Sequence, residues 1–575
     1  MDEKRLIIAV FLSLAVLLAW QWFFAPPPEQ TEQVEQTTAP GGETETLPTS
    51  GATREEEMSL PVEESALPQF STGELTVATE EVKPRDIVVE TGLYRCVLST
   101  SGGVLKSFKL TQFKETPADN SPLKELVSEE LPHDRSPLLT EVNIGGRVFP
   151  RNIVFKADSD EINLVGQGNG VSKLLTMAAD TREGYRIEKV YRFEEGDYRI
   201  PMEIRVSALP TSTDESLIRK NEISKVSVFW FTIVDEQAAK SRFGTYSAVV
   251  YSHNVLEKEN PSRIMKKGPF SYNSPLWVGF ADSYFLRVII PNIGVERAVS
   301  EIEIMGDRQV VNQKLEFSPL EVPERGPAVF KYTVFLGPKD YNLLKSLGEN
   351  LYLDKVVGYG RLEFFIKPLI WLLKLFHKLV FNWGLSIILL TVFVKLVFYP
   401  LTRSSYRQMK ALQALQPRIK EIQEKYKDDR QKMNEEMMAL YRSQKVNPLG
   451  GCLPMLLQLP ILYALYRALY VSIELRHAEF VWWIKDLSSP ERLVHLPLFG
   501  GVDIGLMPIF MGFSMYVQQK MTPTTMDPAQ AKIFMMMPIF FTFISFGFPS
   551  GLVLYWTVSN LLTIAQQYFI NRRGV

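Results

Sequence analysis

The chain has 575 residues, a formal net charge of −2 and a mean hydropathy of −0.02, values typical of an ordinary soluble protein. The average conceals residues 26–82, where thirteen glutamates face one basic residue, Arg54, so this segment carries −12 and the rest carries +10. Two cysteines, Cys96 and Cys452, exclude a disulfide-built scaffold. The five histidines lack metal-ligand spacing, no phosphate-binding glycine loop occurs, and no compact soluble segment is strongly basic. We therefore expect no metal, no cofactor and no nucleic-acid substrate.

The N-terminal residues 1–25 form a hydrophobic segment. Charged residues in Met1–Arg5 precede a mostly apolar stretch from Leu6 to Phe24, which is typical of either a signal peptide or a membrane anchor. The bulky Phe23 and the prolines that follow Ala25 disfavour cleavage. About twenty apolar residues are also enough to span a bilayer core. We predict an uncleaved anchor.

Residues 26–85 are rich in Pro, Glu and Thr, and no aromatic residue appears before Phe70. Such a segment buries too little apolar surface to offset the entropy of ordering it. It is predicted to be a disordered, self-repelling tether. An acidic binding tail is the less favoured alternative.

Period-two hydrophobicity extends over residues 86–338. The apolar or alternating runs are 93–98, 104–110, 190–193, 201–206, 226–234 and 328–336. Short strands at this spacing, separated by turn signals, predict a large antiparallel β-sandwich. Cys96 is interpreted as a small buried hydrophobe. His253 is the one candidate here for carbohydrate chemistry, and a surface or structural histidine is the favoured interpretation.

The C-terminal half has the composition of a polytopic α-helical membrane protein. Residues 361–379 mix apolar side chains with Lys367 and Lys374, as in an amphipathic helix that lies in the membrane interface and extends its lysines to water. A membrane core is predicted at 380–570. Its five predicted spans are 381–401, 449–470, 502–519, 533–548 and 550–570, and the N-terminal anchor makes six. The 533–548 span has only sixteen residues, so as a helix it is about 24 Å long, whereas the hydrocarbon core of a bilayer is about 30 Å thick. We therefore expect the bilayer to be thinned around the protein.

Basic residues in short loops predict which side of the membrane each loop occupies. The 403–446 segment holds eleven Lys or Arg, and a short tail at 571–575 contains Arg572 and Arg573. The 472–499 loop holds three basic and four acidic residues. We therefore expect both termini and the 403–446 segment in the cytoplasm, and the β domain on the periplasmic side.

The 403–446 segment has helical periodicity interrupted at Lys427-Asp-Asp-Arg430. We predict two helices packed as an antiparallel hairpin, with Pro417 bending the first. A structural hairpin with a solvated basic surface and a docking element for a ribosome or nascent chain remain equal alternatives. The candidate cytoplasmic docking residues are Arg403, Arg407, Lys410, Lys420, Lys425 and Asp527.

Lys395 is the basic residue well inside the predicted 381–401 span. A lysine there either extends to the interface or faces a hydrated cavity, and the cavity is favoured because charges inside membranes usually mark a site. Thr391 lies one turn earlier on the same face. Other predicted spans add the polar residues Gln458, Ser514, Gln518, Ser559 and Asn560. No acidic residue in the spans partners Lys395, which disfavours a proton-coupled transporter.

Several motifs keep their order through the C-terminal half. They are Asn382-Trp-Gly384, Tyr399-Pro-Leu-Thr402, Lys445-Val-Asn-Pro-Leu-Gly-Gly-Cys452 and Phe548-Pro-Ser-Gly-Leu-Val-Leu-Tyr555. On these residues the chain resembles the YidC family of membrane-protein insertases, and its anchor, tether and β domain match the Gram-negative layout of that family.

The resemblance implies five core spans around a hydrophilic groove that opens to cytoplasm and lipid. It implies that the β domain is not an enzyme and that Thr391, Tyr555 and Trp556 face incoming segments. Lys395 stands where the family carries an arginine, which keeps the charge and loses the bidentate fork.

The resulting hypothesis is an ATP-independent insertase and chaperone of the bacterial inner membrane. Its expected partners are nascent membrane proteins, the secretion channel complex, the lipid bilayer and, weakly or transiently, the ribosome. A solute or ion transporter with a sensory periplasmic domain and a membrane-tethered carbohydrate-acting enzyme are the alternatives.

Overall fold

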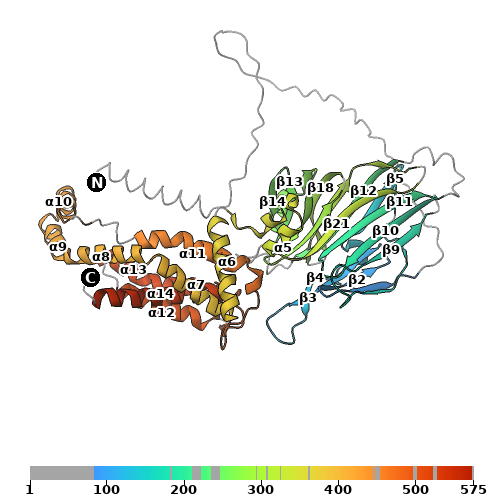
Figure 1. The fold of residues 1–575 in the computed structure, drawn as a ribbon. Helices are drawn as coiled ribbons and strands as arrows, with labels where there is room; N and C mark the ends of the chain where they lie inside the picture. Colours follow the sequence, from blue (N-terminus) through green and yellow to red (C-terminus); the bar gives the residue numbers. More distant parts are fainter. Residues whose placement is uncertain are drawn as a thin grey trace, which may run out of the picture. The chain divides into compact units, whose positions relative to one another are not determined.

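The structure is a computed structural model that contains a β domain and a helical part (Figure 1). The described residues are 83–149, 151–181, 184–209, 222–234, 246–292, 294–305, 308–323, 326–360, 363–444, 446, 453–496, 502–521 and 528–572. The predicted anchor, nearly all of the predicted tether, Asp527 and Cys452 therefore lie outside the described residues.

The β domain contains three sheets. The first has the order β4 (Leu123–Val127), β3 (Val104–Lys114), β2 (Tyr94–Ser99), β1 (Asp86–Glu90), β8 (Glu161–Asn163). The second has the order β14 (Val255–Glu259), β13 (Ser247–Ser252), β16 (Trp277–Ala281), β17 (Phe285–Pro291), β21 (Ala328–Pro338), β11 (Arg199–Ala208), β10 (Tyr185–Glu194), β9 (Ser172–Asp180), β7 (Lys156–Ala157). The third has the order β15 (Phe270–Asn273), β18 (Val295–Met305), β19 (Arg308–Phe317), β12 (Glu222–Val234), β5 (Leu139–Ile144), β6 (Arg147–Val148), with β20 (Leu320–Glu321) also paired to β12.

The predicted antiparallel strands are confirmed, since all six apolar runs fall within or across strands of these sheets. Pairing among the described strands is antiparallel except between β1 and β8, which are parallel. Alternate residues of β11 are buried, as expected where one face of a sheet covers a core. Ile204 of β11 and Leu315 of β19 belong to the same buried cluster, so the second and third sheets share one core.

Two chemistry-bearing residues of the β domain have structural roles. Cys96 is a free, fully buried thiol in β2, as predicted. His253 is exposed at the turn between β13 and β14, where its Nδ1 lies 2.8 Å from the hydroxyl of Ser252. The prediction of a surface histidine is confirmed.

Lys189 of β10 is buried in the β domain with 1 % of its surface exposed. Its Nζ lies 2.8 Å from the carbonyl oxygen of Gly102, and 3.0 Å from those of Gly103 and Leu138. Gly103 has a φ of 55° and lies against the Lys189 side chain, so a larger residue there would be strained and would collide with it. The amine therefore connects the β2–β3 turn to the chain entering β5.

Short helices follow or connect these strands. They are η1 (His133–Arg135), α4 (Pro261–Lys267), α5 (Tyr341–Ser346), η2 (Glu349–Leu351), η3 (Leu353–Val357) and η6 (Ile473–Leu475). Asp340 begins α5 by accepting a hydrogen bond from the Leu343 N–H at 2.8 Å. This carboxylate also receives Lys374 of α6 (Glu363–Val380) at 3.4 Å, and Lys374 forms a second ion pair with Glu474 of η6.

Two lysines of α6 have protein partners in addition to partial exposure, whereas Lys378 is exposed as predicted. Lys367 is ion-paired with Glu363 and donates to the hydroxyl of Tyr341 at 2.7 Å. Lys367 and Lys374 are seven residues apart and lie on one helix face. Acidic and phenolic groups from other segments meet that face, which hydropathy along a single segment does not reveal.

The remaining helices are α7 (Trp383–Val397), α8 (Tyr399–Ala414), α9 (Gln416–Lys425), α10 (Arg430–Ser443), α11 (Leu453–Val471), α12 (Leu506–Met521), α13 (Pro528–Ser545) and α14 (Ser550–Arg572). Within the described part of the chain, no single helix combines the length and apolar content needed to cross a membrane. Helices α7 and α8 meet that test only as a pair, bent by 62°.

The predicted 502–519 span begins four residues late. Residues Val502–Ile504 form β23, which pairs with β22 (Val494–Leu496) in a small antiparallel sheet. The carboxylate of Glu491 then accepts the N–H groups of Leu506 and Met507 at 3.0 and 2.8 Å. A carboxylate on these unpaired N–H groups stabilises a helix start, so α12 begins at Leu506.

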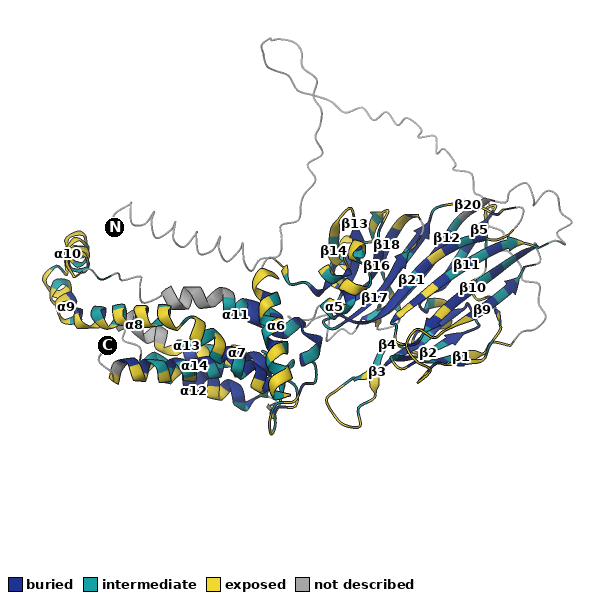
Figure 2. Ribbon diagram, in the orientation of Figure 1, coloured by how far each residue is buried: buried dark blue, intermediate teal, exposed yellow. Residues whose placement is uncertain are grey.

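The basic segment contains three helices, because the bend predicted at Pro417 is a break that divides the first predicted helix into α8 and α9. Helix α8 ends at Ala414 and α9 begins at Gln416, because Pro417 suits the first turn of a helix and breaks its interior. Asp429 starts α10 by accepting the N–H groups of Gln431 and Lys432. Most side chains of these helices are exposed (Figure 2).

We predict that Lys189→Met lowers the unfolding free energy by about 1–3 kcal/mol, because three hydrogen bonds are lost and the Gly102 carbonyl oxygen stays buried without its side-chain donor. Thermal unfolding of the full chain, followed by tryptophan fluorescence, measures this change. Lys331→Met is the matched control, since Lys331 is half exposed and its loss should change stability by no more than about 0.5 kcal/mol. Equal stability of the two variants would show that Lys189 does not hold the turn.

Candidate functional site

Helix α7 begins where Asn382 caps it. The Asn382 Oδ1 accepts the Leu385 N–H at 2.9 Å, and its Nδ2 donates to the Phe480 carbonyl at 3.1 Å. The helix ends at Val397, because Pro400 in the first turn of α8 begins a new helix in another direction. The predicted 381–401 span is thus divided between α7 and α8, which only together pass the length and hydropathy test for a span. Lys395 lies in the last turn of α7, where the helix dipole favours a cation.

The ammonium of Lys395 reaches across to α14. Its Nζ donates to the Thr563 hydroxyl oxygen at 2.8 Å, and the Thr563 hydroxyl donates to the Ser559 carbonyl at 2.7 Å. Lys395 is half buried and Thr563 is buried. Among the described residues, the hydrogen-bond partner of this ammonium is a neutral hydroxyl. The cation is therefore held in place without being neutralised.

Helix α14 presents a buried polar stripe formed by Ser559, Thr563 and Gln567, spaced four residues apart. The stripe extends over about 12 Å of helix. Gln567 Nε2 donates to the Met521 carbonyl at 2.7 Å, and among the described residues its buried Oε1 has no partner. Sequence reasoning missed Thr563 and Gln567, although their spacing from Ser559 was visible in the sequence.

Helices α12 and α14 are joined by a buried hydrogen bond. Asn560 Nδ2 donates to the Ser514 hydroxyl at 3.1 Å, and both residues are buried. The structure thus brings these two predicted site residues together. Gln518, one turn further along α12, is half buried. Gln458 lies on α11, outside the residues whose side chains are described.

The predicted client-contact residues differ in accessibility. Thr391 is fully buried, and its hydroxyl donates to the Ile387 carbonyl of its own helix at 2.7 Å. Tyr555 is also buried, with 2 % of its surface exposed. Trp556 is partly exposed, and its ring meets Phe541 of α13 at a centroid distance of 5.4 Å. Trp556 is thus the accessible member of this set.

The predicted docking residues Arg403, Arg407, Lys410, Lys420 and Lys425 are all exposed on α8 and α9. Among the described residues no ion pair neutralises them, so they form a solvated basic surface. Their alternation along the two helices is compatible with both interpretations of the segment.

Family models match almost the whole described chain. Residues 86–372 match the YidC periplasmic domain, and residues 375–575 match the 60Kd inner membrane protein family. A "Membrane protein insertase YidC" from Pelobacter propionicus is 36 % identical over 571 residues, with 99 % of each chain covered. One of the same name from Syntrophus aciditrophicus is 37 % identical over 590 residues, with both chains fully covered.

The chain belongs to the YidC family. Membership of this membrane protein insertase family implies an inner-membrane location. Neither relative's name supports the transporter or the carbohydrate-enzyme alternative. A solved structure described as an active YidC insertase with its first transmembrane domain resolved is 19 % identical, covers 87 % of this chain and 95 % of its own, and has a TM-score of 0.36. The family assignment therefore rests on the sequence matches.

We predict that Asn560→Ala destabilises the helical part by roughly 0.6–1.7 kcal/mol, the range measured for hydrogen bonds between helices in membranes. The Ser514 hydroxyl keeps its bond to the Met511 carbonyl, so no buried donor is orphaned. Thermal unfolding of the chain in detergent tests this. Leu561→Ala is the control, because Leu561 is the exposed neighbour on α14. A midpoint that falls no further in Asn560→Ala than in Leu561→Ala contradicts the assigned contact.

Proposed function

We propose that the chain inserts client membrane proteins without ATP and assists their folding. A polar client segment enters a hydrophilic groove from the cytoplasm and passes beside Lys395, and the client helix leaves sideways into lipid. The observation that supports this most is the Lys395–Thr563 hydrogen bond, which holds an un-neutralised cation between α7 and α14. Transfer of a polar segment into hydrocarbon is costly, and such a cation with neighbouring hydroxyls and amides lowers that cost.

The α14 stripe extends the groove from Lys395. Gln567 Oε1, buried and without a partner among the described residues, is an acceptor for an N–H of the client backbone. Ser514, Gln518, Asn560 and Gln458 supply further polar groups, and Thr391 and Tyr555 form the packed wall behind them. Trp556, which is partly exposed, contacts the client.

A lysine in place of an arginine changes how the client is held. Lys395 attracts client carboxylates as a point charge, whereas a guanidinium would also impose a bidentate geometry. A point charge favours entry of the client segment into the groove without fixing the orientation of its carboxylates. Such an interaction suits clients of varied sequence. Membrane potential adds about 2.3 kcal/mol per charge per 100 mV to the outward movement of acidic segments.

The exit path follows the apolar surfaces of α12 and α13. Exposed Phe513 and Phe543 belong to these helices and suit contact with lipid and with the client helix. Helix α12, with 16 residues, is about 24 Å long, shorter than the bilayer core of about 30 Å. Local thinning of the bilayer shortens the distance over which the client's polar segment is exposed to hydrocarbon.

The proposed topology has six spans, counting the N-terminal anchor and a bent α7–α8 segment, with both termini in the cytoplasm and the β domain in the periplasm. Helices α9 and α10 form a cytoplasmic hairpin. The exposed basic residues of α8 and α9, together with Asp527, dock the ribosome transiently as it delivers the nascent chain. The secretion channel complex is a further partner for clients with large translocated domains.

No Asp or Glu occurs in α7 or in α11 to α14, so these helices contain no carboxylate relay of the kind proton-coupled transporters use. Solute transport is therefore not proposed as a second function.

The experiment that tests the insertase proposal is site-specific photocrosslinking to a stalled nascent membrane protein. A photoreactive residue at Trp556 should crosslink the nascent chain, whereas one at exposed Leu561 of the same helix should crosslink it at least several-fold less. Absence of a crosslink at Trp556, or equal crosslinking at Leu561, would show that the client does not pass along this face of α14.

A charge series at Lys395 tests the cation. Lys395→Arg should keep insertion of acidic clients, and Lys395→Glu should reduce it by about tenfold or more, since a unit charge pair at 4 Å is worth about 4 kcal/mol at an effective dielectric constant of about 20. Insertion is measured by protease protection in proteoliposomes. Lys378→Glu makes the same charge reversal at an exposed residue of α6, and this variant should insert clients normally. Normal insertion by Lys395→Glu would exclude Lys395 from the mechanism.

A further inference from the structure

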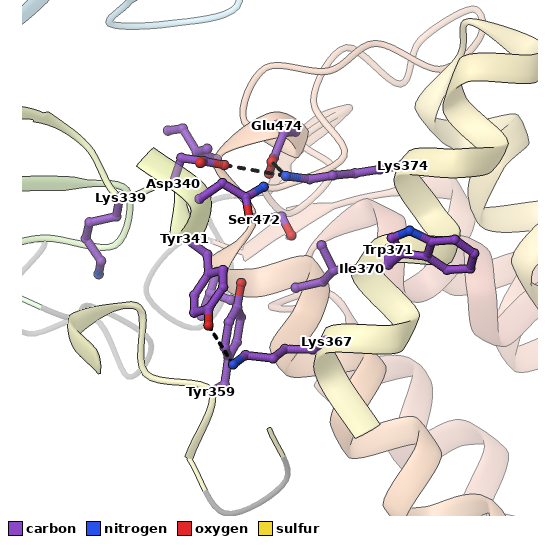
Figure 3. A pocket seen from close by; sticks show the side chains of 13 residues that line it. Lys339, Asp340, Tyr341, Tyr359, Lys367, Ile370, Trp371, Lys374, Ser472 and Glu474 are labelled. Atoms are coloured by element: carbon purple, nitrogen blue, oxygen red, sulfur yellow. Dashed lines mark hydrogen bonds and ion pairs between the residues drawn. The ribbon is translucent and has the colours of Figure 1, made fainter. Parts of the chain in front are cut away.

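A cavity of about 190 Å³ lies beside α6, away from the Lys395 site (Figure 3). Its walls come from the segment after β21, from α6, and from the end of α11 with η6. The lining residues are Lys339, Asp340, Tyr341, Asn342, Tyr359, Lys367, Ile370, Trp371, Lys374, Val471, Ser472, Ile473 and Glu474. The volume holds roughly six water-sized groups, which is the scale of a phosphodiester with a short amine arm.

Two ammonium groups of α6 offer donors at this cavity. Lys367 contacts Glu363 and Tyr341, and Lys374 contacts Asp340 and Glu474 (Figure 3). An ammonium has three N–H donors, so two partners among the described residues leave one N–H on each lysine. Burial lowers the pKa of both lysines, but the neighbouring carboxylates outweigh it and raise the pKa, so both are charged at neutral pH.

The charges that face the cavity have both signs. Lys367 and Lys374 are balanced by Asp340 and Glu474. The ammonium of Lys339 lies apart from these four groups, because its side chain points away from the other labelled residues and its Nζ donates to the Asp282 carbonyl at 2.7 Å (Figure 3). A cavity with balanced charges disfavours a free phosphate dianion. It suits a group that carries one negative and one positive charge a few ångströms apart.

The adjoining surface of α6 is apolar. Phe364, Trp371 and Leu379 are exposed by 81, 63 and 66 %, and with Pro368 and Leu375 they form one stripe along the helix. Trp371 belongs both to this stripe and to the cavity wall. In a protein of the inner membrane, such a stripe lies against acyl chains, and a tryptophan marks the level of the headgroups.

We propose that this cavity binds the headgroup of a zwitterionic aminophospholipid whose acyl chains lie along the α6 stripe. The phosphodiester accepts hydrogen bonds from Lys367 and Lys374. The primary ammonium donates to Asp340 and Glu474. The bound lipid thereby connects α6 to the segment that leaves the β domain.

Lipid retention by the full-length chain tests this site. The chain is released into a mass spectrometer from nanodiscs that contain equal parts of phosphatidylethanolamine, phosphatidylglycerol and phosphatidylcholine. Wild type should retain phosphatidylethanolamine preferentially, because phosphatidylglycerol has no cation and the choline group has no N–H to donate. Equal retention of the three lipids would overturn the proposal.

Three variants locate the binding. Lys367→Met and Trp371→Ala should each lower lipid retention by about tenfold. The first variant loses one charge-assisted hydrogen bond to the lipid, and the second loses the packing of the indole ring against it. Trp371 is largely exposed, so its truncation leaves the fold intact and keeps the test valid if Lys367→Met unfolds. Lys378→Met is the matched control, because Lys378 is an exposed lysine of α6 that does not line the cavity. Retention lowered equally by Lys378→Met would indicate nonspecific charge and refute the site.

Soluble competitors distinguish a lipid from a free ligand. Excess glycerophosphoethanolamine or inorganic phosphate should leave the bound lipid in place, since neither reaches the α6 stripe. Complete displacement by either compound would show that the cavity binds a small anion or zwitterion and would overturn the lipid assignment. Insertase activity is not the readout, so failure here is separable from failure of the proposed function.

Discussion

An ammonium group removed from water requires hydrogen-bond acceptors to offset its lost hydration, and the lysines of this chain meet that requirement in three ways. Lys189 has three backbone carbonyls and joins segments of the β domain. Lys374 has two carboxylates and joins α6 to α5 and η6. Lys395 has one hydroxyl. The number and charge of these partners distinguish Lys189 and Lys374, which hold segments of the fold together, from Lys395, which we propose attracts the client.

The same constraint explains where the helices begin and end. The unpaired N–H groups at the start of a helix need acceptors. Side-chain oxygens of Glu491, Asn382 and Asp429 accept N–H groups at the starts of α12, α7 and α10, respectively. Each cap lies in a segment that hydropathy alone would assign to a loop or to the edge of a span. The starts of α7, α10 and α12 are therefore set by single polar residues.

Period-two patterns located six strands (β2, β3, β10, β11, β12 and β21), because burial on one face of a sheet leaves a direct trace in the sequence. Charge counts located the exposed basic face of α8 and α9 equally well. The break at Phe398 was missed, because an average over apolar residues conceals one proline. Thr563, Gln567 and the partners of Lys374 were missed for another reason. The four-residue spacing of Ser559, Thr563 and Gln567 is visible in the sequence. However, each of the missed residues acts through a partner more than 30 positions away, and a single sequence contains no record of that proximity.

Lys374 and Lys395 together suggest how the two parts of the chain cooperate. Helix α6 immediately precedes α7, so ion pairs that fix α6 also restrict the start of α7, which Asn382 ties to the 472–493 loop. Lys395 lies less than four turns further along α7. A cation that must stay poised beside Thr563 needs a helix that does not rotate. The half-buried pairs at α6 supply that restraint at modest cost in stability, since paired charges at this depth are nearly balanced by their lost hydration. If Lys395 acts as proposed, replacing the acidic residues around Lys374 is expected to weaken insertion although they do not touch the client.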